Sequence, residues 1–185
     1  MTLEAQHLSF DDLAVRIASL GPVPRDTGRI ALVVARPDVD ARETPARCRL
    51  SPEGGVENDR WSKREPVIAD AQITIMRADV AKVFANGQAL SLSGDNLLVE
   101  LDLSPANLPL GTRIRVGTAL CEVTAKPHRG CDKFAARFGQ AARDITGADA
   151  FVLMRLRGLY VRVTAAGEVG PGDSIDVIER PRIYP

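Results

Sequence analysis

The chain has 185 residues, of which 45% are hydrophobic, and its 24 basic side chains balance its 24 acidic ones. This length fits one domain that buries a core of its own, and zero net charge argues against a nucleic-acid-binding protein. No apolar run approaches the roughly 20 residues that span a bilayer, and residues 1–12 lack the apolar core of an export signal. We therefore expect a cytoplasmic protein with neither nucleic acid nor membrane as a partner.

The first twenty residues have the pattern of an amphipathic helix. Ser9 is a suitable N-cap, Leu13 and Ile17 follow helical spacing, and a Gly-Pro pair ends the segment. The pattern then changes to short strands. We therefore predict an N-terminal helix and linker over residues 1–25 and a main domain over residues 26–185.

The main domain is predicted to be mostly β with a few helices. Helices are expected at residues 78–85 and 132–144, and residues 36–49, rich in charge and proline, are expected to form a surface loop. Short strands separated by glycine-rich turns indicate a closed or partly closed β-barrel. The expected strands cover residues 29–35, 67–76, 96–103, 113–116, 119–124, 160–164 and 174–178.

The most informative stretch surrounds Cys131. This cysteine follows Gly130 and stands at the start of a predicted helix, where backbone N–H groups and the helix dipole favour an anion. Nearby positive charges should likewise favour the thiolate form, which attacks sulfur and ligates soft metals. These charges belong to Lys126, Arg129, Lys133 and Arg137.

Alternative interpretations of the cysteines remain open. Cys131 could be a small buried hydrophobic residue, as many free cysteines are. Together with His128 it could bind zinc, but a structural zinc site needs four ligands and no second ligand pair is evident. Cys121, in an apolar strand-like run, and Cys48, away from any helix terminus, are expected to be structural. An odd number of cysteines indicates a reducing compartment.

A second polar cluster is the Gly-Gly-Val-Glu-Asn-Asp-Arg-Trp run at residues 54–61. Its paired glycines would let backbone approach a ligand closely, although a simple turn between strands explains them equally well. Taken together, these segments resemble a MOSC domain, the C-terminal part of molybdenum cofactor sulfurases. The resemblance runs from about Gly28 to the end of the chain. It rests on residues 54–61, 95–99, 110–117, 121–124, 158–163 and 172–177, and above all on the Cys-x-Lys-Phe-x-x-Arg-Phe-Gly run that begins at Cys131.

The resemblance implies a β-barrel-like fold with a pocket at the cysteine. Cys131 takes the position of the family's cysteine, which carries persulfide sulfur or ligates molybdenum in the pterin cofactor. Asn58 stands where the family pattern has glycine. The resemblance assigns cofactor binding to Asn58, Asp59, Arg60 and Asn96, which match pocket-side motifs, and to Lys126, His128, Arg129, Lys133 and Arg137, which would face the anionic pterin phosphate.

Functions of different classes follow from the resemblance. One is an enzyme, either a molybdenum-cofactor-dependent oxidoreductase that reduces small N-hydroxylated compounds or a sulfur transferase. Another is a non-catalytic carrier of sulfur or cofactor, and a third is a β-barrel interaction module without chemistry. The sequence contains neither a pyridoxal-phosphate desulfurase domain nor a ferredoxin domain. We therefore expect a small-molecule substrate or cofactor, with a cysteine desulfurase or redox partner on a separate chain.

Overall fold

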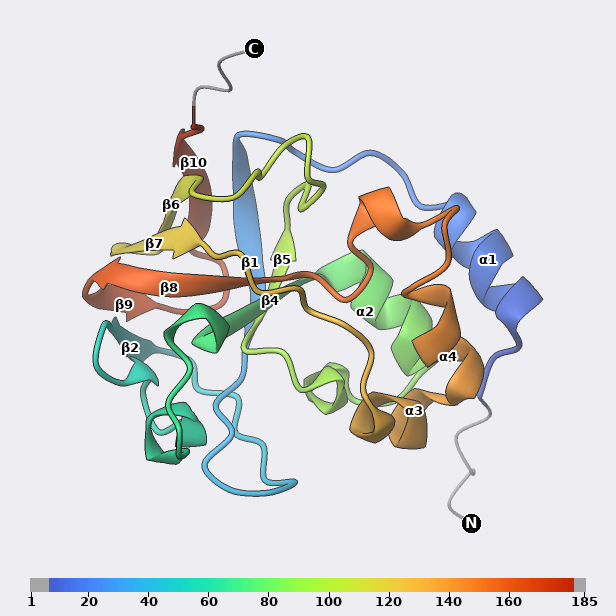
Figure 1. Ribbon diagram of the computed structural model, residues 1–185, viewed down its shortest axis with the longest axis horizontal. Helices are drawn as coiled ribbons and strands as arrows, with labels where there is room; N and C mark the ends of the chain where they lie inside the picture. The colour runs from blue at the N-terminus through green and yellow to red at the C-terminus, as the bar shows by residue number, and fades with distance from the viewer. Residues whose placement is uncertain (1–6, 182–185) are drawn as a thin grey trace.

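The computed structural model describes residues 7–181 as a closed β-barrel with helices along one side (Figure 1). Around the barrel the strands follow the order β1 (Thr27–Val33), β10 (Ser174–Glu179), β6 (Arg113–Val116), β7 (Ala119–Val123), β8 (Leu159–Ala165), β4 (Ile73–Arg77) and β5 (Leu97–Glu100). Strand β5 pairs back with β1, which leaves the barrel without a free edge. Only the pair β4 and β5 is parallel within these residues. The prediction of a mostly-β, barrel-like fold with an N-terminal helix is confirmed.

The hairpin of β6 and β7 shows how local sequence sets the register. Residues in β6 alternate between exposed and buried, and Ile114 lies opposite Cys121 in the neighbouring strand. The connecting Gly117 has a φ of +57°, and a side chain there would collide with the carbonyl group of Glu168. This hairpin was predicted from alternation and the Gly-Thr turn, and it is confirmed.

A small second sheet packs against the barrel. It consists of β3 (Gly55–Val56), β2 (Cys48–Ser51) and β9 (Gly167–Val169), in that order. The prediction of a loop over residues 36–49 was therefore wrong at its end, because pairing with the distant β9 draws Cys48 into a strand. The predicted strand at 67–76 begins only at Ile73, after a 3-10 turn (Ala69–Ala71).

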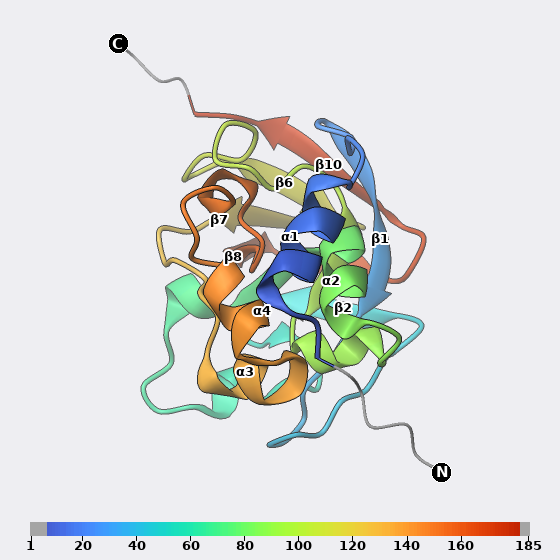
Figure 2. The same ribbon diagram turned by 90° about the vertical axis from the view of Figure 1, so that its right-hand side faces the viewer.

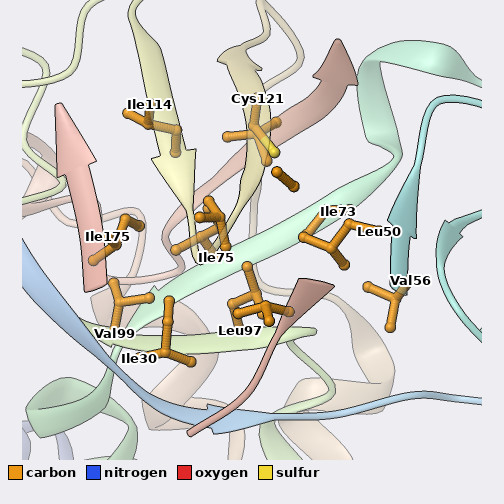
Figure 3. Close-up of a cluster of buried hydrophobic side chains, with 14 of the residues drawn as sticks. Ile30, Leu50, Val56, Ile73, Ile75, Leu97, Val99, Ile114, Cys121 and Ile175 are labelled. Atoms are coloured by element: carbon orange, nitrogen blue, oxygen red, sulfur yellow. The ribbon is translucent and has the colours of Figure 1, made fainter. Parts of the chain in front are cut away.

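The barrel interior is filled almost entirely by aliphatic side chains. Figure 3 shows Ile30, Ile75, Val99 and Ile114 pointing into this interior, and all four are fully buried. Cys121 is 1% exposed and packs among them. A core of this kind needs no metal or disulfide to hold it.

Four helices gather on one side of the barrel and share a second core (Figure 2). They are α1 (Phe10–Ala18), α2 (Ala78–Ala85), α3 (Asp132–Phe138) and α4 (Gln140–Ile145). The Ser9 hydroxyl accepts a hydrogen bond from the Asp12 N–H, so the predicted cap of α1 is confirmed. Leu13 and Ile17 are buried in the helical core, and the division at residues 25 and 26 stays a prediction. The part of the predicted helix in residues 1–6 lies outside the described residues.

The single helix predicted at residues 132–144 is in fact two. Gly139 separates α3 from α4 with a φ of +92°, which interrupts the helical backbone. A Cβ atom at this position would lie 2.9 Å from Cβ of His7, so glycine is also required by packing. None of the helices in the described part of the chain could cross a bilayer, given their length and polarity.

Candidate functional site

Cys131 is the accessible thiol of this protein. It lies immediately before α3, and its carbonyl oxygen accepts hydrogen bonds from the N–H groups of Phe134 and Ala135 at 2.9 and 3.0 Å. Its side chain is exposed, whereas Cys48 and Cys121 are buried. Burial raises the pKa of Cys48 to about 11 and that of Cys121 to about 12. Among these three thiols, all within the described residues, Cys131 alone is open to a reactant.

Asp59 and Asn96, both predicted as site residues, meet in a buried network with Arg36. The Asn96 Nδ2 donates to Asp59 Oδ2 at 2.9 Å, and Arg36 donates to the Asp59 carboxylate through Nε at 2.7 Å and Nη2 at 3.2 Å. Burial alone would raise the pKa of Asp59. Hydrogen bonds and charge from Arg36, aided by Asn96 and the Trp61 N–H, outweigh it and hold this pKa below its ordinary value.

The amide of Asn96 has no hydrogen-bonding capacity left for a ligand. Its oxygen accepts from Arg36 Nη2 and from both the N–H and hydroxyl of Thr74, and its nitrogen also donates to the Val34 carbonyl. The role we assign to Asn96 is therefore to hold Arg36 in place. Arg36 itself lay in the predicted surface loop and was missed, because its partners are 23 and 60 residues away in the sequence.

Replacing Arg36 by Met should destabilise the fold strongly. The change leaves the buried carboxylate of Asp59 and the amide oxygen of Asn96 without their charged donor, which typically costs about 3–5 kcal/mol. Urea unfolding at neutral pH measures the loss. Arg29→Met, at an exposed position, serves as the matched control and should stay within about 0.5 kcal/mol of the parent. Equal stabilities in the two variants would mean that the network does not depend on Arg36.

Arginines from three separate segments gather beside this network. We name Arg36, Arg42, Arg60, Arg64 and Arg137 the arginine cluster. Gly94 lies beside three of these arginines: Arg36 Nη1 donates to the Gly94 carbonyl at 2.9 Å. Arg137 Nη1 and Arg42 Nη2 lie 3.2 and 3.7 Å from where a Cβ of Gly94 would be. A side chain at residue 94 would therefore fill the space between guanidinium groups.

The arginine cluster carries more positive charge than its carboxylates balance. Asp59 pairs with Arg36, and the exposed Asp40 pairs with Arg137 at 2.8 Å. Within residues 7–181 no ion pair reaches the other three arginines, Arg42, Arg60 and Arg64. Burial, followed by the charges of neighbouring arginines, lowers the pKa of Arg42 and of Arg64. Guanidinium groups in this arrangement can donate charge-assisted hydrogen bonds to an oxyanion such as phosphate.

A second buried polar group joins Asp95, His128 and Arg157. Arg157 Nη1 donates to Asp95 Oδ2 at 2.8 Å, and Arg157 Nη2 lies 3.0 Å from His128 Nε2. Burial, and then the charge of Arg157, lowers the pKa of His128 to about 3, so its ring is neutral at physiological pH. Because a guanidinium only donates, Nε2 must accept, and the ring proton sits on Nδ1, 3.6 Å from Asp95 Oδ1.

Arg157 also connects this group to the helix that Cys131 begins. Its guanidinium lies over the ring of Phe134 in α3, with Cζ 4.4 Å from the ring centroid. Its Nε is buried and finds no acceptor among the described residues, a situation that costs about 1–3 kcal/mol for a donor. Neither Asp95 nor Arg157 was predicted as a site residue, although Asp95 is an isolated charge beside an apolar run.

His128 and Arg157 of this group also line a cavity of about 800 Å³. The predicted site residues Lys126, His128 and Arg129 belong to its walls, which come from Pro105, residues 124–130, 143–144 and 146–148, Val152 and residues 155–159. Cys131 does not line it, and it directly follows the wall residue Gly130. The arginine cluster does not line it either. The predicted site residues thus fall into two places, the arginine cluster and this cavity. Cys131 lies on the segment between Gly130, which lines the cavity, and Arg137, which belongs to the arginine cluster.

Asn58 and Lys133 stand apart from these contacts, whereas Arg60 belongs to the arginine cluster. Asn58 adopts a φ of +61°, a conformation in which asparagine is among the better tolerated residues other than glycine, and its side chain donates to Glu43 at 2.6 Å. Lys133 is exposed on α3, and Arg60 is half-buried in the 3-10 helix Arg60–Lys63. In the part of the chain that the structure describes, no three His, Cys, Asp or Glu residues are placed to hold a metal ion.

The structure thus combines a closed barrel with an exposed thiol at the start of an adjoining helix. The family model of the MOSC domain matches residues 68–176, and the chain therefore belongs to the MOSC domain family. The resemblance drawn from the sequence is thus confirmed. This membership supports a molybdenum-cofactor-related, sulfur-binding protein in the broad sense.

Solved structures of similar fold are known. YuaD from Bacillus subtilis is 18% identical with a TM-score of 0.55, covering 83% of this chain and 97% of that one. YiiM from Escherichia coli is 20% identical with a TM-score of 0.55, covering 83% and 71%. YiiM from Geobacillus stearothermophilus is 19% identical with a TM-score of 0.51, covering 86% and 76%. Comparison of the sequence with curated proteins gives no match.

Proposed function

We propose that this protein binds the molybdenum cofactor, carries persulfide sulfur, or does both, and that Cys131 performs the chemistry. The observation that carries the proposal is the accessibility of Cys131 beside two basic sites, while the other two cysteines are buried. A thiolate is both a nucleophile toward sulfur and a ligand for soft metals. Three free thiols also favour a reducing compartment, and the cytoplasm is the location we propose.

The residues present fit a pterin cofactor. A metal that arrives already held by an organic cofactor needs few protein ligands, and Cys131 can supply one. The arginine cluster supplies donors for the anionic phosphate group, with Arg60 and Arg137 among the residues named from the family motifs. Asp59 and Asn96 fix the position of Arg36 within it. When bound, the cofactor would supply the redox chemistry for reducing small N-hydroxylated compounds.

Sulfur transfer to Cys131 needs only groups that the chain and a donor persulfide provide. The Cys131 thiolate attacks the outer sulfur of the donor, the donor's S–S bond breaks, and the donor leaves as a thiolate. Cys131 then holds the persulfide, with no net oxidation or reduction. The donor would be a cysteine desulfurase on a separate chain. Lys133, on the exposed face of α3, and the neighbouring cations would steer an acidic partner or an anionic ligand to this thiol.

Sulfur or molybdenum loading should disappear when Cys131 is replaced by Ser. Serine has nearly the same volume but lacks the soft nucleophile, and the exposed position should tolerate the change. Intact mass and metal analysis after expression with cofactor supply measure the loading. Cys48→Ala, which removes a buried thiol, serves as the control and should load normally. Full loading of the serine variant would mean that a residue other than Cys131 performs the chemistry.

The same measurement separates an enzyme from a carrier. Stoichiometric molybdenum favours an oxidoreductase with bound cofactor. A mass increase of one sulfur atom on Cys131 without metal favours a sulfur carrier or transferase. Absence of both from wild-type protein would leave the β-barrel interaction module as the better description and would contradict the proposal.

A further inference from the structure

The cavity beside His128 has the charge of an anion-binding site in its own right. Within residues 7–181, no ion pair or side-chain hydrogen bond engages Lys126 or Arg129, both of which line it. Arg143 also lines it and pairs only with Asp132, whose carboxylate side chain is 93% exposed. The one lining carboxylate, Asp144, accepts a hydrogen bond from Gln140 at 2.7 Å. The walls therefore present uncompensated positive charge.

The cavity wall also supplies an apolar surface. Leu156 and Leu159 line the same cavity and are almost fully buried, and Val152 adds an exposed apolar side chain. A volume of about 800 Å³ lies in the range of roughly 300–1,000 Å³ in which proteins bind small organic ligands. An inorganic ion would use only the charged part of such a space.

We propose that this cavity binds a small organic anion that joins an oxyanion head group to an apolar body. Lys126 and Arg129 hold the head group, and the apolar body packs against Val152, Leu156 and Leu159. This ligand is separate from the anion of the arginine cluster, because no residue of that cluster lines the cavity. The inference goes beyond the proposed function and holds whether or not Cys131 carries sulfur.

The fluorescent probe 8-anilinonaphthalene-1-sulfonate, which joins a sulfonate to aromatic rings, tests this site by titration with the full chain. We expect one molecule of probe to bind per chain. Lys126→Glu or Arg129→Glu removes a charge-assisted contact and should weaken binding of the probe by about tenfold or more. Gly147→Phe should abolish it, because Gly147 lines the cavity and a Cβ there meets only ordinary contacts. The controls are Lys82→Glu, at an exposed lysine outside the cavity, and Gly21→Phe, in open space; both should bind like wild type.

Three outcomes would overturn the inference. Unchanged binding in Gly147→Phe would place the probe elsewhere on the molecule. If inorganic phosphate displaced the probe with an affinity equal to that of the probe, the ligand would need no apolar body. Weaker binding of the probe to Arg60→Ala would mean that the cavity and the arginine cluster form one site. Cys131→Ser should bind the probe normally, so failure of sulfur loading and failure of this site are distinguished.

Discussion

Iodoacetamide at pH 8 is expected to alkylate Cys131 before either of the other cysteines reacts. Alkylation requires a thiolate that the reagent can reach. With pKa values raised to about 11 and about 12, Cys48 and Cys121 are ionised to only about one part in a thousand and one part in ten thousand at this pH, and both are also buried. Cys131 is exposed before α3. We expect a rate ratio of at least about a hundredfold.

Peptide mapping after timed labelling of the reduced, metal-free protein measures this ratio. Labelling in strong denaturant is the control, since there all three thiols lose their folded environment and should react at similar rates. Two results would contradict the structure. Equal labelling of Cys131 and Cys121 in the folded protein would mean that the barrel core opens readily. Slow labelling of Cys131 alone would mean that another group covers its side chain.

Stability is expected to fall as the pH drops below 6.5, and His128 should account for most of this dependence above the range where carboxylates titrate. Its pKa in the folded protein is about 3, through burial and then the charge of Arg157, against an ordinary value of 6.5. Below pH 6.5 the His128 ring therefore takes up a proton in the unfolded chain but not in the native state. The free energy of unfolding should decrease by about 1.4 kcal/mol for each pH unit, or about 2–3 kcal/mol between pH 6.5 and 4.5. The contribution of His128 decreases to zero as the pH rises about one unit above 6.5.

Urea unfolding at several pH values tests this slope against two variants. His128→Asn lacks the titrating ring and should have a nearly flat profile between pH 6.5 and 4.5, whatever its absolute stability. His7→Asn, at the other histidine, which is exposed, should keep the wild-type slope. The burial of Asp59 with Arg36 adds a separate loss only at lower pH, because the pKa of that carboxyl is held down. A slope that survives in His128→Asn would refute the role of His128.

The local features of this protein follow from its sequence. The helix at residues 78–85 has the expected bounds, and Asn86 ends it in a left-handed conformation with a φ of +43°. The hairpin through Gly117 and the cap at Ser9 were equally predictable, since each depends on residues within a few positions of one another. The position of Cys131 at the start of a helix was predictable for the same reason. Neighbouring residues decide dihedral angles, caps and turns, so pattern alone suffices for them.

The tertiary structure decided which charges are buried together. Arg36 was assigned to a surface loop and Asp95 to no helix or strand, yet they belong to networks that also contain Asp59 and Arg157. Their partners lie 23 and 62 residues away, and the sequence does not specify such pairings. Gly139, with a φ of +92°, divides a helix whose apolar spacing continues on both sides, and His7, distant in the sequence, leaves no room for a Cβ there. Buried charge must be paired at whatever distance along the chain the partner lies, and only the folded barrel brings these partners into contact.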